Sequence, residues 1–239
     1  MRNLKRALSL ALAAIMLIGM MVVSASAAGF DDFSDKDEIV NKDAVSMLTT
    51  LGVINGKEDG SYFDPTGNVT RAEMAKMIAT VLNQGADVDG LYVGMNTGLT
   101  DVKGHWAESY INYCYSLGII AGRGNGKFDP AATVTGNEAA KMLLVALGYD
   151  AKVANYVGND WAINVAADAV NAGIAPKGIV LADAMTREQA AQMAFQTLTA
   201  DMVYYTNKGT TVIGSDGMQV IVGASAPVKV ANSTTDDYR

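Results

Sequence analysis

Two arginines occupy positions from which they could bind an anion. Arg71 and Arg187 each follow a threonine that can cap the start of a helix, Thr70 and Thr186. Arginine beside the free N–H groups of a helix start is suited to binding a carboxylate or a phosphate. A single arginine there is more simply explained as a tolerated surface residue, although it opposes the helix dipole. Because the position is repeated, we treat anion binding as an equally strong interpretation.

Glutamate recurs three residues after the capping threonine. Glu73 follows Thr70, and Glu138 follows Thr135, at the spacing of a capping box. In such a box the threonine side chain accepts from the backbone N–H of the glutamate, and the glutamate reaches back to the threonine N–H. We therefore interpret both glutamates as capping partners rather than as catalytic acids.

Two tryptophans lie at matching distances before later glycine turns. Trp106 precedes the turn that begins at Gly118 by the same interval as Trp161 precedes Gly173. Tryptophan at the start of a helix most often packs in a core or between repeats. The alternative is a platform for a sugar ring with arginine nearby. Arg71, Glu73, Trp106, Trp161 and Arg187 are thus the candidate ligand-binding residues.

Other chemistry finds little support in the sequence. The glycine loops that contain Asp59, Asp64, Asn125 and Asp129 lack the ligand spacing of a calcium-binding EF-hand and are interpreted as turns. We identify no nucleotide-binding loop, zinc cluster or Ser–His–Asp set, so we expect no catalytic residue, cofactor or metal. The single cysteine, Cys114, cannot form an intrachain disulfide and is expected to be buried and unreactive.

These residues belong to a block that occurs three times. A glycine turn (Gly52, Gly118 or Gly173) is followed by a capping threonine and an apolar helix face. The face of the first copy has apolar residues at Met74, Met77, Ile78, Val81 and Leu82. The helix before its turn is expected over residues 40–51. Its inward face is expected to consist of Val40, Ala44, Met47, Leu48 and Leu51. The sequence therefore predicts a mainly α fold built from three helix–turn–helix repeats.

The remaining segments differ in character. Residues 1–27 have the basic start, apolar run and small-residue end of a secretory signal peptide. Repeats are assigned to residues 28–83, 99–148 and 149–202, the third being degenerate, and a glycine-rich surface linker occupies 84–98. The alternation of β-branched residues and turns over 203–231 predicts a short β-hairpin or meander. Residues 232–239 are polar and expected to be disordered.

The charge of the chain limits its partners. The formal net charge is −7, and it becomes −10 without residues 1–27, because Arg2, Lys5 and Arg6 leave with them. An acidic chain is a poor candidate for binding nucleic acid or anionic lipid. A local basic pocket can still bind an anion, since charges act over only a few ångströms in salt. After signal cleavage we expect no stable membrane insertion.

Taken as an ordered set, these motifs resemble the S-layer homology (SLH) domain. The likeness covers residues 33–201 and is carried by Phe33-Ser34-Asp35, Thr70-Arg71-Ala72-Glu73, His105-Trp106-Ala107, Gly118-Ile119-Ile120-Ala121-Gly122 and Gly126-Lys127-Phe128-Asp129-Pro130. The resemblance implies a pseudo-threefold arrangement of three SLH repeats around a central helical bundle. It also implies ligand grooves between neighbouring repeats, with the motif arginine and the tryptophan as groove residues.

The resemblance implies a non-enzymatic anchor of an exported protein. Such domains bind the cell wall non-covalently, often through a secondary cell-wall polysaccharide that carries pyruvate ketals. The expected partner is that polysaccharide or another peptidoglycan-linked polymer. A lattice subunit whose repeats contact other S-layer subunits is the alternative, and an enzyme that acts on wall glycan would need paired carboxylates, of which we find no candidate.

Three departures from the family pattern bear on the number of grooves. Gly136-Asn137 replaces Arg-Ala in the second repeat, Val40 replaces tryptophan in the first, and the third repeat lacks the Asp-Gly loop. We therefore expect one or two working grooves. The groove of Arg71 is the best candidate because its motif is intact.

Overall fold

The described part of the chain begins after the expected signal peptide. The computed structural model describes residues 29–57, 60–215 and 219–230. The predicted signal peptide (1–27) and polar tail (232–239) lie outside the described residues.

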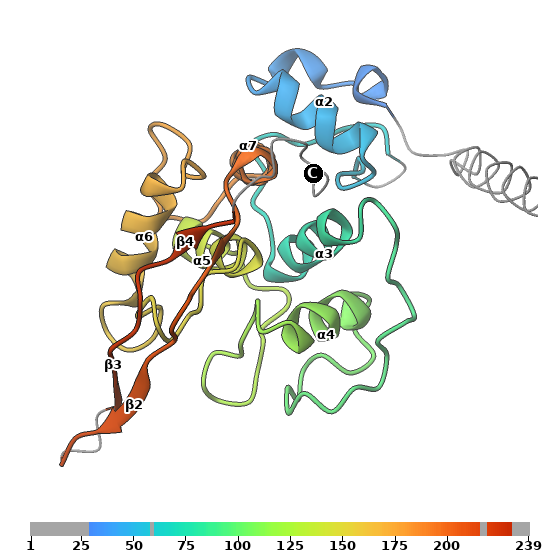
Figure 1. The fold of residues 1–239 in the computed structure, drawn as a ribbon. Helices are drawn as coiled ribbons and strands as arrows, with labels where there is room; N and C mark the ends of the chain where they lie inside the picture. The colour runs from blue at the N-terminus through green and yellow to red at the C-terminus, as the bar shows by residue number, and fades with distance from the viewer. Residues whose placement is uncertain (1–28, 58–59, 216–218, 231–239) are drawn as a thin grey trace, which may run out of the picture.

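The fold is mainly α-helical, as predicted. Two 3₁₀ helices, η1 (Phe30–Asp32) and η2 (Lys36–Glu38), precede six α-helices in the described ranges (Figure 1). These are α2 (Lys42–Thr50), α3 (Arg71–Leu82), α4 (Glu108–Ser116), α5 (Gly136–Ala146), α6 (Trp161–Asn171) and α7 (Arg187–Thr199). Among the residues described, no helix combines the length and the apolar character that crossing a membrane requires.

The second helix of each pair begins with the predicted capping motif. At the start of α3, the Thr70 side chain accepts from the Glu73 N–H, and the Glu73 carboxylate accepts from the Thr70 N–H. Thr135 and Glu138 form the same box on α5. On α7 the box is formed by Thr186 with Gln189. The interpretation of Glu73 and Glu138 as capping partners is confirmed. In the third repeat the uncharged Gln189 takes the place of the glutamate in the same capping box.

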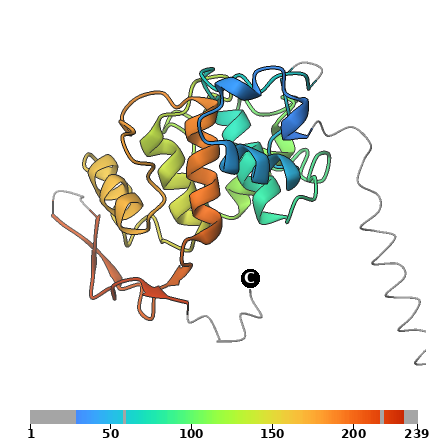
Figure 2. The same cartoon turned by 90° about the horizontal axis from the view of Figure 1, so that it is seen from above.

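The helices pack mainly between repeats. Helices α3, α5 and α7 contact one another, and α5 and α7 lie side by side in the centre of Figure 2. The first helix of each pair packs on the second helix of another pair: α4 on α3, α6 on α5 and α2 on α7. The arrangement is therefore closed, because the first helix of the chain packs against the last one.

A ring of backbone hydrogen bonds joins the three helix pairs just before α3, α5 and α7. The Val69 N–H donates to the Met185 carbonyl (3.0 Å), and the Met185 N–H donates to the Val134 carbonyl (2.9 Å). The Val134 N–H then donates back to the Val69 carbonyl (2.9 Å). Val69, Val134 and Met185 are at most 1% exposed. The ring fixes the three helix starts relative to one another in the core.

The inward face predicted for the first helix is partly wrong. Ala44 and Leu48 are buried as expected, and they are joined by Val45. Val40, Met47 and Leu51 are instead exposed, by 81%, 46% and 41%. The pattern failed because α2 is short and packs on α7 through one narrow face, rather than on its own partner helix.

The linker at 84–98 has no helix or strand, but it is held against α4. The Glu108 carboxylate accepts from the N–H groups of Gly94 and Gly104, at 2.8 and 2.7 Å. The Asn112 amide donates to the Tyr92 carbonyl, and the Tyr110 hydroxyl donates to Asp87. Polar side chains of α4 therefore order a segment whose own sequence shows no periodicity.

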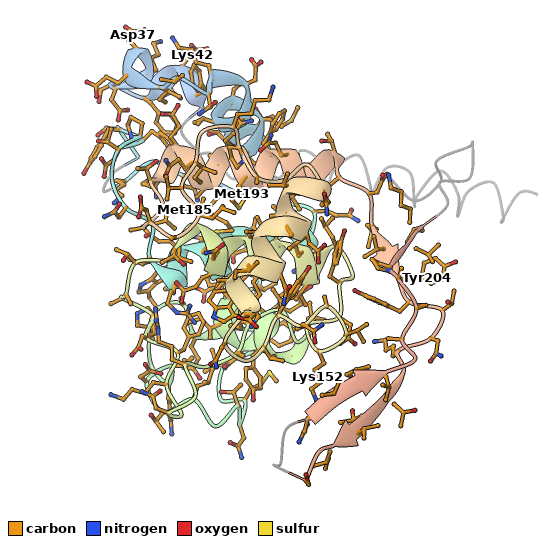
Figure 3. The ribbon with its side chains drawn as sticks, turned by 90° about the vertical axis from the view of Figure 1, so that its left-hand side faces the viewer. Asp37, Lys42, Lys152, Met185, Met193 and Tyr204 are labelled. Carbon is orange, nitrogen blue, oxygen red and sulfur yellow. The ribbon has the colours of Figure 1, made fainter. Side chains whose placement is uncertain are left out.

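The C-terminal segment contains four short strands in two antiparallel pairs, one of which is the predicted hairpin. Strand β2 (Thr210–Ile213) pairs antiparallel with β3 (Gln219–Val222), while β1 (Val203–Tyr204) pairs with β4 (Val228–Lys229). Residues 207–209 therefore connect β1 of one strand pair to β2 of the other. In Figure 3 the β2–β3 hairpin points away from the helices, whereas Met185 and Met193 lie between α7 and the helices beneath it. Lys208 ties the segment to Asp150 at 2.9 Å.

Candidate ligand-binding grooves

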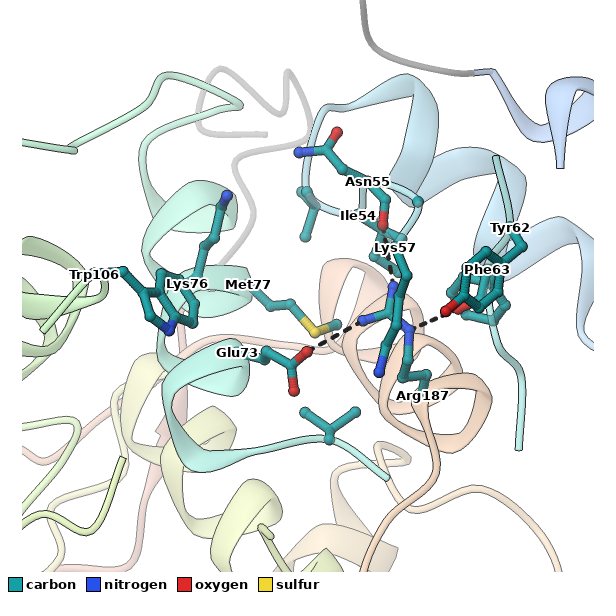
Figure 4. Close-up of a pocket in the computed structure, with 13 residues that line it drawn as sticks. Ile54, Asn55, Lys57, Tyr62, Phe63, Glu73, Lys76, Met77, Trp106 and Arg187 are labelled. Carbon is teal, nitrogen blue, oxygen red and sulfur yellow. Dashed lines mark hydrogen bonds and ion pairs between the residues drawn. The ribbon is translucent and has the colours of Figure 1, made fainter. Parts of the chain in front are cut away.

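Groove 1 lies where the first helix pair meets residues from the other two. It encloses about 450 Å³ and is lined by Val53, Ile54, Asn55, Gly56, Lys57, Tyr62, Phe63, Val69, Glu73, Lys76, Met77, Trp106 and Arg187. Figure 4 shows Trp106 and Lys76 on one side and Arg187 beside Phe63 on the other, with Glu73 and Met77 between them. One groove thus combines an aromatic surface with three cationic side chains.

Groove 2 is built in the same way from the next helix pair. It encloses about 600 Å³ and is lined by Arg71, Ile119, Ile120, Ala121, Gly122, Arg123, Gly124, Glu138, Lys141, Met142, Tyr156, Val157, Gly158 and Trp161. Its residues correspond in the repeat register to those of groove 1, with Glu138 for Glu73, Lys141 for Lys76 and Trp161 for Trp106. The structure therefore brings each predicted tryptophan together with a predicted arginine from a different repeat.

Arg71 forms the inner wall of groove 2 and is 4% exposed. Its guanidinium donates to the Phe128 carbonyl (2.8 Å) and to Glu138 (2.9 Å), and it lies 4.4 Å from the centre of the Phe128 ring. Burial lowers the pKa of Arg71, whereas the charge of Glu138 raises it. Because most of its donors are used inside the protein, Arg71 chiefly ties two repeats together.

Arg187 plays the equivalent part in groove 1, with a looser ion pair. It donates to the carbonyls of Phe63 (2.7 Å) and Asn55 (3.1 Å), and it lies 3.7 Å from the Glu73 carboxylate. The Arg187 side chain is 12% exposed, against 4% for Arg71. Arg187 is therefore the more accessible of the two arginines. This difference does not support the expectation that the groove of Arg71 is the best candidate.

The free helix N–H groups proposed as part of an anion site are already occupied. At the start of α3, the N–H groups of Arg71 and Ala72 donate to the Ala132 and Pro130 carbonyls, and the third N–H is capped by Thr70. The Arg187 N–H of α7 likewise donates to the Gly67 carbonyl. The interpretation of these helix starts as direct anion sites is therefore wrong, because loops of the neighbouring repeats satisfy them.

Each of the two grooves also has a half-buried lysine that was not among the candidate residues, in addition to Lys57 and Arg123. Lys76 and Lys141 each lie three residues after the capping glutamate and line grooves 1 and 2. The Lys141 ammonium lies 5.3 Å from the centre of the Trp161 ring. Its pKa is lowered, first by desolvation and then by the charge of Arg71, while Glu138 raises it. An anion in groove 2 would relieve that repulsion. Comparing the repeats in register could have identified these lysines.

The tryptophans differ in exposure. Trp106 is 54% exposed, and its ring lies 6.4 Å from that of Tyr110. Trp161 is half-buried and packs against the core. Both rings therefore keep part of their surface open to the grooves, so the interpretation as sugar platforms stays a prediction alongside their packing role.

A third groove lacks the charged side chains that recur in grooves 1 and 2. Groove 3 encloses about 380 Å³ and is lined by Asn41, Pro176, Lys177, Gly178, Ile179, Gln189, Gln192 and Gln196. In the repeat register, Gln189 stands where the other grooves have a glutamate, and Gln192 stands where they have a lysine. The register positions of the arginine and the tryptophan are held by Gly136 and the exposed Val40, which lie outside this lining. A Cβ atom on Gly136 would lie 2.8 Å from the Leu181 Cα, so this helix start is also closely packed. Grooves 1 and 2 keep the full set.

The described residues show no cluster of three or more His, Cys, Asp or Glu side chains that could hold a metal ion. The aspartates of the glycine loops instead act within the loops. Asp101 accepts from the N–H groups of Phe128 and Asp129, both at 2.8 Å. Asp129 in turn pairs with Arg123 at 3.2 Å. These contacts support the interpretation of the loops as turns.

Comparison with known proteins identifies related sequences. The family model described as S-layer homology domain matches residues 32–75 and 98–140. A cell surface protein of Thermoanaerobacter kivui is 30% identical over 243 residues, which cover 99% of this chain and 30% of the relative. An S-layer protein of Bacillus licheniformis is 32% identical over 111 residues, covering 46% of this chain and 12% of the relative.

A third relative has a name that refers to an enzyme. An uncharacterized cell wall amidase of Bacillus anthracis is 29% identical over 161 residues, covering 60% of this chain and 28% of the relative. The chain thus spans less than a third of the length of these three relatives.

Proposed function

Because the chain is an S-layer homology domain protein, we propose that it attaches to the bacterial cell wall by binding an anionic, pyruvylated secondary cell-wall polysaccharide. The similarity to cell surface and S-layer proteins places the chain among secreted proteins of the cell-wall surface, with a role in anchoring or in an S-layer. The proposal adds the ligand and assigns it to grooves 1 and 2.

We further infer that three SLH repeats surround a pseudo-threefold axis, with α3, α5 and α7 as the central bundle. The family match falls within the first two repeats. The inference that α6 and α7 form a third is supported by the capping box of Thr186 and Gln189. It is also supported by the place of Met185 in the closed hydrogen-bond ring.

The observation that carries the proposed function is the recurrence of one side-chain set in two grooves. Each groove presents a lysine of the inner helix, an arginine of a neighbouring repeat and a tryptophan. A carboxylate on a sugar can pair with the lysine while the sugar ring packs on the tryptophan. A hydrogen bond to a charged group contributes about 1.5–3 kcal/mol, so one groove alone binds weakly. Two grooves on one polymer would raise the apparent affinity by avidity.

The Lys76→Gln/Lys141→Gln double variant tests the proposal. It gives grooves 1 and 2 the glutamine that groove 3 has at Gln192, so each groove loses one of its cations with little change in shape. We expect the affinity for purified wall sacculi to fall at least about tenfold, the loss that follows from one charged contact of about 1.4 kcal/mol. The measurement is co-sedimentation of the variant with sacculi over a range of protein concentrations.

A matched control separates the groove charge from the net charge. Lys103→Gln/Lys152→Gln removes two exposed cations outside the three grooves, the same number as the test variant, and should leave binding unchanged. The lysines are better probes than Arg71 and Arg187, because replacing a buried arginine would also weaken the fold. Wild-type binding by the double variant would overturn the assignment to grooves 1 and 2.

The S-layer relatives favour a second candidate function, a lattice subunit whose repeats contact other subunits. Sacculi stripped of their non-peptidoglycan polymers distinguish the two. An anchor should lose its target on stripped walls, whereas lattice formation in solution should be unaffected. We expect binding to be lost.

The family match and the S-layer relatives indicate a non-enzymatic module. Only 28% of the amidase relative is matched, so the similarity does not transfer its activity to this chain. A glycan-release assay on sacculi should accordingly give no soluble product.

A further inference from the structure

The dipeptide Asn-Gly occurs twice in the chain, as Asn55-Gly56 and Asn125-Gly126, and a lysine follows each copy. Asparagine is chemically labile, and it is most labile before glycine, because glycine lacks the Cβ atom that would shield its backbone nitrogen from the asparagine side chain. Both asparagines are exposed. Asn55 lines groove 1, whereas Asn125 is absent from the linings of all three grooves. Two copies followed by the same residues thus meet different surroundings.

The backbone amide between Asn55 and Gly56 is contacted by an arginine. The Arg187 guanidinium donates to the Asn55 carbonyl at 3.1 Å, and this carbonyl belongs to the same amide as the Gly56 nitrogen. When that nitrogen gives up its proton, negative charge spreads onto the carbonyl oxygen. A cationic donor directed at the oxygen stabilises this charge. Because of Arg187, more of the Gly56 nitrogen is therefore present as the nucleophilic anion at a given pH.

The two groups that would react in this copy are not held by other contacts. Among the residues that the structure describes, none accepts from the Gly56 N–H and none forms a hydrogen bond with the Asn55 carboxamide. In Figure 4 the Asn55 carboxamide points away from Arg187. The fold also requires glycine after Asn55, because a Cβ atom on Gly56 would clash with the Gly60 carbonyl.

The second Asn-Gly copy and the second groove each lack one part of this arrangement. The Asn125 carboxamide oxygen already accepts from the Lys127 N–H at 3.1 Å, and within the described ranges no arginine donates to the Asn125 carbonyl. In groove 2 the Arg71 guanidinium lies 3.5 Å from the Ala121 carbonyl, but alanine takes the place of asparagine. Of the two charged grooves, groove 1 is therefore the one that combines the arginine contact with Asn-Gly.

We propose that Asn55 is a site of spontaneous deamidation that changes the charge of groove 1. The deprotonated Gly56 nitrogen attacks the Cγ atom of Asn55 and forms a bond with it, and the side-chain nitrogen leaves as ammonia after taking up a proton from water. The product is a succinimide ring. Water then opens the ring at either of its two carbonyl groups, which gives aspartate or isoaspartate. Nothing is oxidised or reduced, and water is the other reactant.

The new carboxylate weakens the binding of an anion in groove 1. The lining of this groove holds Lys57, Lys76 and Arg187 against Glu73, so one more carboxylate lowers its net charge from +2 to +1. Isoaspartate also adds a methylene group to the backbone beside the carbonyl that Arg187 contacts. Groove 2, which has no asparagine in its lining, does not change. This consequence rests on the proposed function, whereas the deamidation itself does not.

Incubation of the folded protein at pH 8, followed by peptide mass spectrometry, tests the site. We expect Asn55 to be converted at least about fivefold faster than Asn125, a modest share of the effect of one oriented donor on a developing oxyanion. In urea-unfolded protein the two rates should be similar, because Gly-Lys follows both asparagines. Arg187→Gln should bring the two rates in the folded protein closer together, with circular dichroism as the check that the variant is folded.

Asn55→Ala, which gives groove 1 the alanine that groove 2 has at Ala121, is the control for the consequence. On incubation the affinity of the wild type for sacculi should fall about two- to fivefold, the range of one exposed charge interaction. The affinity of Asn55→Ala should stay constant over the same time.

The outcomes separate the modification from its effect. Equal rates in the folded protein, or faster conversion of Asn125, would overturn the site, and this comparison decides even where Arg187→Gln does not fold. Conversion of Asn55 at an unchanged rate in folded Arg187→Gln would overturn the part assigned to the arginine. Conversion without loss of wall binding would support the modification but overturn its consequence for groove 1.

Discussion

Each capping glutamate has two oxygens with different tasks. In Glu138, Oε2 accepts from the Thr135 N–H and caps α5, while Oε1 pairs with Arg71 of another repeat. Glu73 does the same with Thr70 and Arg187. The glutamate that caps the helix therefore also forms an ion pair with an arginine of another repeat. The sequence predicted the first task, because it depends on a spacing of three residues. It could not predict the second, because the partner lies more than 60 residues away in the chain.

At the residue scale, we predict that Arg71→Ala lowers the free energy of unfolding by about 3 kcal/mol. Removing one member of a buried ion pair leaves the charge of the other uncompensated, at a typical cost of about 3–5 kcal/mol. We expect the lower end of this range, because Arg123 remains 3.3 Å from the Glu138 carboxylate and still pairs with it. Urea unfolding measures the effect. Lys152→Gln, which removes an exposed cation outside the grooves, should change stability by less than about 0.5 kcal/mol. Equal stabilities of the two variants would show that Arg71 does not hold the repeats together.

A second residue-scale prediction concerns the single thiol. Cys114 is fully buried, and burial raises the pKa of its thiol to about 12. At pH 8 the folded protein should therefore react with a disulfide reagent such as Ellman's reagent only at the rate of its unfolding. Addition of urea should expose one reactive thiol per chain. Rapid labelling of the native protein would contradict both the burial and the inert role of this cysteine.

At the scale of the element, the helices that begin with a capping box were predictable, and so was the presence of α2, but the buried face of α2 was not. Thr70, Thr135 and Thr186 mark the starts of α3, α5 and α7 through local hydrogen bonds. Helix α2 has no side-chain cap. Its buried face is selected by α7, which lies more than 130 residues further along the chain. A pattern of apolar residues shows that a helix has an inner face, but it does not show which neighbour covers that face.

For α5, we predict that Gly136→Ala destabilises the protein by about 1–2 kcal/mol. Alanine normally stabilises a helix by about 1 kcal/mol relative to glycine. Here a Cβ atom would lie 2.8 Å from the Leu181 Cα and 2.9 Å from its carbonyl oxygen, and backbone cannot rotate away. Thermal or urea unfolding gives the sign of the effect. Asn171→Ala, at the exposed end of α6, is the control and should change stability by less than about 0.5 kcal/mol. A stabilised Gly136→Ala variant would show that the helix start is looser than described.

The loop of the second repeat should give the stability a pH dependence. Burial raises the pKa of Asp101, but the hydrogen bonds from the N–H groups of Phe128 and Asp129 outweigh it, and the net pKa is lowered. A carboxyl with a lowered folded-state pKa contributes stability above its unfolded pKa of about 3.9, and this contribution is lost as the pH falls through the folded value. Asp101→Asn should therefore be less stable than the wild type at pH 7, with a smaller difference near pH 2. A difference that does not vary with pH would contradict this account.

At the scale of the whole molecule, the grooves arise only when the repeats are assembled. Arg71 belongs to the first repeat but lines the groove of the second, and Arg187 of the third lines the groove of the first. In the sequence the changed residues fall in separate repeats, and one or two working grooves were expected. The packing of α2 on α7 instead forms groove 3, where Asn41, next to Val40, lies with Gln189 and Gln192. The sequence could therefore identify candidate residues, but it could not show which residues of different repeats line the same groove.

The same closure predicts that the repeats do not fold separately. In an open array each repeat contacts only its neighbours, so removing a terminal repeat leaves the others folded. Here a fragment of residues 29–148 would lose α7, which covers α2, and Met185, which completes the hydrogen-bond ring. We expect this fragment to show no cooperative thermal transition by circular dichroism. A fragment of residues 29–202, which lacks the strands from β1 onward but keeps the ring, is the control and should unfold cooperatively. A cooperative transition in the shorter fragment would mean that the ring adds little to a fold already stable in its first two repeats.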